Sequence, residues 1–103
     1  MVNMILSIIC GSLFFNAIPH LVKGICGEMH MTPFSRKSSA WLNVIWGWIN
    51  LIVAAVIAIC LNFVTWGVAT WIGFGLGGIG ISIWLSIFWS NPDARLPWHT
   101  DEP

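Results

Sequence analysis

Apolar residues occupy most of this chain, and the charged residues gather in two short stretches. Residues 40–89 are fifty positions without a single Lys, Arg, Asp, Glu or His, and residues 2–22 form an earlier, predominantly apolar stretch. One membrane crossing needs about 20 apolar residues, so 40–89 is long enough for two crossings joined by a tight turn. The pattern predicts an all-α integral membrane bundle of three transmembrane helices, over about 3–22, 40–61 and 66–89.

The connections follow from the same pattern. A polar loop, 23–39, joins the first two predicted helices, and 62–65 form a turn before the third. Pro92 ends the third helix because proline cannot continue it. The polar tail that follows, 90–103, is expected to be partly disordered. The chain has no room for a separate soluble domain, so 1–103 is predicted to be a single membrane domain.

Composition and charge exclude two classes of protein. Hydrophobic residues make up 57% of the chain and charged residues 8%, whereas a soluble domain carries about 25% charged residues. Too little charge is present to cover a water-facing surface, so membrane lipid is the expected surrounding. The formal net charge is zero and the four basic residues are scattered, which argues against a nucleic-acid partner.

The basic residues also predict an orientation. Lys23, Arg36 and Lys37 lie in the first loop, the turn has none, and Arg95 lies in the tail. Because Lys and Arg favour the cytoplasmic side of a membrane, the first loop and the C-terminus are predicted to be cytoplasmic. The N-terminus and the turn then lie outside.

One histidine and three asparagines form two polar pairs inside the first two predicted helices. Asn16 and His20 are four residues apart, and Asn43 and Asn50 are seven apart, so each pair lies on one helix face. In the predicted orientation both faces lie in the cytoplasmic half of the bilayer and can turn toward each other. Together with Trp46, these residues form a predicted pocket.

Two interpretations of this polar set stay open. Asparagines that bond across helices can simply hold a membrane bundle together, each contributing about 0.6–2 kcal/mol. An ionisable side chain inside the membrane is, by contrast, a functional-site hypothesis in itself. His20 is the one such residue in the predicted helices, and histidine can exchange a proton near neutral pH.

Small residues mark one stripe of the third predicted helix. Gly73 and Gly77 form a GxxxG pair, and Gly78, Ser82 and Ser86 follow at intervals of four residues. Such stripes let helix backbones approach closely, within one chain or between copies. Three helices bury little surface alone, so we expect these residues to pack helices and the chain to form a homo-oligomer.

Catalytic and metal-binding patterns are weak. Cys26, Met29, His30 and Met31 offer soft ligands suited to Cu(I), but a single loop supplies them all, and we predict no metal site and no cofactor. His20 has no Ser or Cys nucleophile nearby, and paired carboxylates and a phosphate-binding loop are lacking. The sequence therefore does not favour an enzyme.

Four short motifs follow one another within about residues 14–51: Asn16-Ala17-Ile18-Pro19-His20, Thr32-Pro33-Phe34, Ser38-Ser39 and Asn43-Val44-Ile45-Trp46-Gly47-Trp48-Ile49-Asn50. The succession resembles that of an uncharacterised group of small bacterial multi-pass membrane proteins, which carry Asn-x-x-Pro-His and later Asn-Val-x-Trp-Gly-x-x-Asn. The resemblance implies a bacterial inner membrane. It implies no particular activity.

These observations lead to two functional hypotheses. In the first, a small membrane protein binds or passes a small solute, ion or proton at the predicted pocket on the cytoplasmic side. In the alternative, the chain is an accessory or regulatory subunit that acts through helix–helix contact with a larger membrane complex.

Overall fold

The protein is built from three long helices. A computed structural model describes residues 2–99 and is mostly helical, at 74%. The helices are α1 (Val2–Ile25), α2 (Ala40–Cys60) and α3 (Val68–Trp89). Each is long and apolar enough to cross a membrane. The predicted all-α architecture with three helices is confirmed.

The start of α2 and the end of α3 match the prediction, and the other helix ends differ from it by one to three residues. α1 continues to Ile25 and closes on Gly27, whose φ of 77° is a left-handed conformation that favours glycine. Ser39 caps α2, because its hydroxyl accepts the backbone N–H of Leu42. α3 begins two residues later than predicted, since Phe63–Thr65 forms a 3₁₀ helix, η1, and Gly67 is the N-cap.

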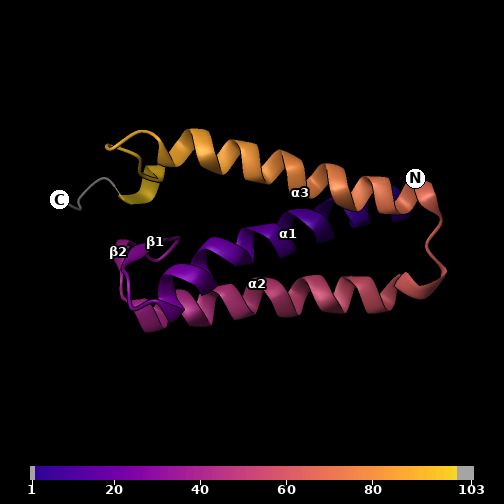
Figure 1. Cartoon of the computed structure of the whole chain (residues 1–103), viewed down its shortest axis with the longest axis horizontal. Helices are drawn as coiled ribbons and strands as arrows, with labels where there is room; N and C mark the ends of the chain where they lie inside the picture. The colour runs from indigo at the N-terminus through magenta and orange to yellow at the C-terminus, as the bar shows by residue number, and fades with distance from the viewer. Residues whose placement is uncertain (1, 100–103) are drawn as a thin grey trace.

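α1 lies between the other two helices and crosses them obliquely (Figure 1). Its N-terminal half packs on α3, where a methyl group at Gly77 would overlap the Ile8 carbonyl and one at Gly11 would overlap the Phe74 carbonyl. Its C-terminal half packs on α2, where Gly24 meets Ala40. α2 and α3 scarcely contact each other. The bundle therefore opens at both ends, between α2 and α3 at the turn and between α1 and α3 at the loop.

Two polar segments fill the open space at the loop end. The loop folds into a hairpin of β1 (His30–Thr32) and β2 (Ser35–Ser38), which pair antiparallel. The described part of the tail forms a second 3₁₀ helix, η2 (Pro97–His99). The partial disorder expected for the tail stays a prediction, and residues 100–103 lie outside the described residues.

Hydrogen bonds from Trp98 and Arg36 hold the tail on the hairpin. Trp98 Nε1 donates to the Pro33 carbonyl at 2.7 Å. Arg36 donates through Nε to the Ala94 carbonyl and through Nη2 to the Pro92 carbonyl, both at 3.1 Å. The hairpin and the tail thus form a cap over one end of the bundle, on the side where α1 and α3 separate.

Candidate functional site

A cavity of about 160 Å³ lies beneath this cap. We call it the hairpin-end cavity. α1 contributes two polar side chains, α2 one tryptophan and α3 four large apolar side chains, and the hairpin and tail supply the rest of the lining. The lining residues are Asn16, His20, Met31, Thr32, Pro33, Trp46, Trp84, Leu85, Phe88, Trp89 and Leu96.

His20 is held in the cavity wall by Asn43. His20 Nδ1 and Asn43 Oδ1 are 2.8 Å apart, and the two residues are 5% and 0% exposed. The other end of the amide, Asn43 Nδ2, lies within hydrogen-bond distance of the backbone carbonyls of His30, Ser38 and Ser39, at 2.8–3.2 Å. Asn43 therefore ties α1, α2 and both strands of the hairpin together.

This arrangement decides which ring nitrogen of His20 carries the proton. Carbonyl oxygens only accept hydrogen bonds, so the end of the Asn43 amide that faces them must be the NH₂ group. The Oδ1 atom then faces His20, and Nδ1 of His20 must donate to it. In the neutral ring, Nε2 is left as an acceptor. Within residues 2–99, the bond to Asn43 is the one hydrogen bond of this ring.

A second polar pair lies one helical turn deeper. Asn16 Nδ2 donates to Asn50 Oδ1 at 3.2 Å, and Asn50 Nδ2 donates to the Trp46 carbonyl one turn back on its own helix, at 2.9 Å. Asn50 is 4% exposed and does not line the cavity, whereas Asn16 does. The side-chain oxygen of Asn16, Oδ1, has no hydrogen-bond partner within the described part of the chain.

The five predicted pocket residues do come together, but in two layers. Asn16, His20 and Trp46 line the cavity. Asn43 and Asn50 lie behind them and hold the first two in place. The polar set is therefore both a packing device and part of a cavity wall.

Sequence reasoning missed the wall of the hairpin-end cavity that α3 supplies, which includes Trp89. His30 and Trp89 pack on each other with ring centroids 4.2 Å apart, and the His30 ring lies 5.3 Å from that of His20. His30 Nε2 and Trp89 Nε1 are buried without a hydrogen-bond partner in the structure of 2–99. The aromatic cluster at the end of α3 was the one available signal, because Trp84, Phe88 and Trp89 lie within six residues.

His30 is uncharged at neutral pH. Burial, with smaller contributions from His20 and Lys23, lowers the pKa of His30 to about 4. Lys23 itself forms an ion pair at the protein surface, where its Nζ lies 3.5 Å from Glu28 Oε2. No acidic residue, lysine or arginine of the described part of the chain lines the cavity itself.

The stripe of small residues on α3 divides into two halves. Gly73, Gly77 and Gly78 are buried against α1. Ser82 and Ser86 are exposed, and their hydroxyls donate to carbonyls of α3 itself, at 2.7 and 2.8 Å. The division follows from the oblique crossing, because α1 and α3 have separated at the level of Ser82 and Ser86.

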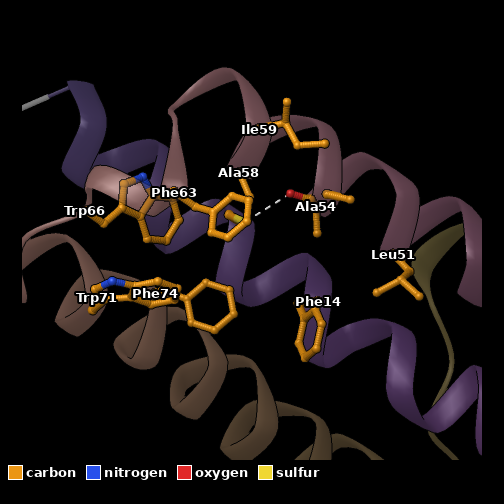
Figure 2. A pocket seen from close by; sticks show the side chains of 11 residues that line it. Phe14, Leu51, Ala54, Ala58, Ile59, Phe63, Trp66, Trp71 and Phe74 are labelled. Carbon is orange, nitrogen blue, oxygen red and sulfur yellow. Dashed lines mark hydrogen bonds between the residues drawn. The ribbon is translucent and has the colours of Figure 1, made fainter.

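A second cavity, of about 300 Å³, lies at the turn end between α2 and α3 (Figure 2). Five aromatic side chains gather there, and the rest of its lining is aliphatic apart from Cys10. The Cys10 thiol donates to the Ala54 carbonyl at 3.2 Å, and Trp66 Nε1 donates to the Leu61 carbonyl at 3.2 Å. No polar group in this wall is left to bind a polar ligand.

The loop residues with soft ligand atoms do not converge. Cys26 and Met29 are exposed, whereas Met31, in β1 of the hairpin, is buried. Among the described residues no three His, Cys, Asp or Glu side chains are placed to hold a metal ion.

Comparison with known proteins identifies no relative. No family model, no curated protein and no solved structure matches the chain. The resemblance of 14–51 to small bacterial membrane proteins stays a prediction.

Proposed function

We propose that this protein binds a small uncharged solute in the hairpin-end cavity, within the cytoplasmic half of a bacterial inner membrane. One observation carries the proposal: Asn16 and His20 line a largely apolar cavity, and each is held there by an asparagine behind it. Fixed polar groups in an apolar wall are typical of small-molecule sites. Polar groups inside a membrane cost free energy, and those that occur there commonly serve a function.

The charge of the lining favours a neutral solute over an ion. An unpaired ion in an apolar site costs several kcal/mol or more, and among residues 2–99 no acidic residue, lysine or arginine lines the cavity. Passage of an ion or proton across the membrane would also need polar groups along the whole path. The cavity at the turn end offers none, so binding is favoured over conduction.

The orientation of the site follows from charge. Lys23 in the last turn of α1 and Arg36 and Lys37 in β2 lie at the cavity end, and Arg95 belongs to the tail docked on the hairpin. The positive-inside rule therefore supports a cytoplasmic hairpin, with the N-terminus on the opposite side.

The proposal is tested by filling the cavity. Leu85 lines it, whereas Leu76 is exposed on the same helix, so Leu85→Phe is the test and Leu76→Phe the matched control. Purified protein in detergent would be unfolded thermally with phenol, tert-butanol or acetamide, and with NaCl or KCl. A solute at ten times its Kd stabilises a protein by about 1.4 kcal/mol. We expect stabilisation by at least one neutral solute in the wild type and in Leu76→Phe, and none in Leu85→Phe.

The alternative role, as an accessory subunit or as a homo-oligomer, is favoured by the outward half of the α3 stripe. Ser82 and Ser86 present a small surface to which another helix can approach closely. If no solute distinguishes wild type from Leu85→Phe, while a second copy or a stoichiometric membrane protein co-purifies, that role replaces the binding proposal.

A further inference from the structure

One ring nitrogen in the wall of the hairpin-end cavity is a hydrogen-bond acceptor without a partner. Because Asn43 fixes the proton of His20 on Nδ1, the neutral ring keeps a lone pair at Nε2. The unpaired ring nitrogens that have no accessible surface within residues 2–99 belong to His30, Trp89 and His99. Nε2 of His20 is unpaired but not one of them, so a molecule in the cavity that His20 lines can reach it.

A second acceptor lies one helical turn away, on Asn16. The Trp46 carbonyl can only accept, so Asn50 must face it with its NH₂ group. Oδ1 of Asn50 then faces Asn16, whose own NH₂ group must donate to it. The end of the Asn16 amide that remains is Oδ1, which has no partner in the described chain and is not fully buried.

The two hydrogen-bond chains have the same polarity for the same reason. Each begins at backbone carbonyls, passes through an asparagine of α2 and ends on a side chain of α1 that lines the cavity. Because a carbonyl cannot donate, every group along the chain must donate toward it, and the last atom can only accept. The ligand of these two atoms must therefore bring hydrogen-bond donors.

The spacing of the two acceptors favours one donor group over two separate ones. Asn16 and His20 are four residues apart on α1, which places their Cβ atoms about 5–6 Å apart. The two N–H bonds of an –NH₂ group diverge by about 120° and reach acceptors about 2.9 Å from the nitrogen. A single –NH₂ group therefore bridges acceptors about 5 Å apart, whereas a hydroxyl group donates only once.

From these features we infer that the solute is a primary amide or a urea, whose –NH₂ group donates to both His20 Nε2 and Asn16 Oδ1. An amine has the same donors but is charged at pH 7, and no acidic residue among 2–99 lines the cavity to balance that charge. The inference rests on the proposed function, because it assumes that the cavity is a binding site.

A series of amides tests the inference on the wild-type protein. Acetamide, N-methylacetamide and N,N-dimethylacetamide keep the carbonyl group and lose one N–H at each step. Affinities would be obtained at pH 8, where an ordinary histidine is neutral, from the concentration dependence of thermal stabilisation. Leu85→Phe in the same detergent corrects for effects on the micelle. We expect the Kd to rise about fivefold for each N–H removed, as the loss of one net hydrogen bond implies.

Two further probes control for size and charge. Propionamide adds its methyl group away from the nitrogen and keeps both donors, so its Kd should stay within about twofold of that of acetamide. Methylammonium has the donors of an amine and a positive charge, and we expect it not to bind.

Nitrogen-15 NMR of histidine-labelled protein tests the acceptor directly. Without ligand, the Nε2 resonance of His20 should lie in the range of an unprotonated ring nitrogen. Acetamide should shift it toward the protonated range, and N,N-dimethylacetamide should leave it unchanged. His99 does not line the cavity, so its resonances serve as the internal control, and His20→Phe assigns the signal.

The two proposals fail in different ways. The amide inference is wrong, and a binding cavity remains, if N,N-dimethylacetamide binds as tightly as acetamide, if methylammonium binds more tightly than acetamide, or if acetamide binds without shifting the Nε2 resonance. The same holds if phenol or tert-butanol stabilises wild type but not Leu85→Phe while no amide does so. If none of the amides, phenol or tert-butanol distinguishes wild type from Leu85→Phe, the proposed function is wrong as well.

Discussion

Asn43 connects α1, α2 and the hairpin through a single amide group. Its oxygen accepts from His20 and its nitrogen faces three carbonyls of the hairpin and of the α2 cap. The seven-residue spacing of Asn43 and Asn50 places them on one helix face, which the sequence alone indicates. The partners of Asn43 belong to a loop whose conformation no local pattern specifies, so the sequence could not reveal that this asparagine is structural.

His30 makes the stability of the fold depend on pH. Its pKa is about 4 in the folded protein and about 6.5 in an unfolded chain. Between these values the unfolded state binds a proton that the native state does not, so the free energy of unfolding falls as the pH falls from about 6.5 to about 4. Because the ring is only partly buried, we expect a loss of roughly 2 kcal/mol over this range, measured by denaturation in detergent at pH 7, 5.5 and 4.

The control for this prediction is His30→Phe, which keeps a ring against Trp89 and cannot be protonated. Its stability should change much less between pH 7 and pH 4 than that of wild type. An equal decline in both proteins would assign the pH dependence to other groups.

At the scale of elements, the contact between α1 and α3 depends on glycines from both helices. The Gly73/Gly77 pair can be recognised in the sequence as a packing motif. Its counterpart Gly11 cannot, because a lone glycine in an apolar helix has no distinctive pattern. The structure shows Gly11 and Gly77 each touching a carbonyl of the opposite helix.

Substitution by alanine should affect stability differently at the packed glycines of α3 and at those with open space around them. Gly77→Ala would overlap the Ile8 carbonyl, which cannot move away without displacing α1. We expect a loss of stability of roughly 1–3 kcal/mol, the usual cost of overpacking. Gly75 and Gly80 have open space around the same position, so their alanine variants should be neutral or gain up to about 1 kcal/mol from helix propensity. Thermal unfolding of the three variants measures the difference, and equal stability would contradict the close approach.

At the scale of the whole molecule, the oblique path of α1 accounts for both cavities. Where α1 leaves α3, the hairpin and tail border a largely apolar cavity with two polar side chains from α1. Where α1 leaves α2, aromatic side chains surround an apolar cavity (Figure 2). A straight, parallel bundle would fill both spaces with its own side chains.

Two natural cysteines report the proposed orientation. Cys26 is exposed beside the hairpin, and Cys60 is exposed at the opposite end, where α2 stops at the turn. With a membrane-impermeant maleimide applied from outside, we expect labelling of wild type and of Cys26→Ser, and none of Cys60→Ser. Inverted membrane vesicles should show the reverse. Cys10 is buried and serves as an internal negative control. Labelling of Cys26 from outside would invert the proposed orientation.

The sequence by itself determined the three helices, the positions of their ends to within a few residues, and the polar faces of α1 and α2. These features are local, because hydropathy over about 20 residues and hydrogen bonds within one helix decide them. The tertiary structure alone decided which half of the α3 stripe meets α1, which asparagines stand behind the cavity, and that Trp89 lines the cavity and packs on His30. Those outcomes depend on how helix faces from distant parts of the chain meet, and the crossing of α1 determines that meeting.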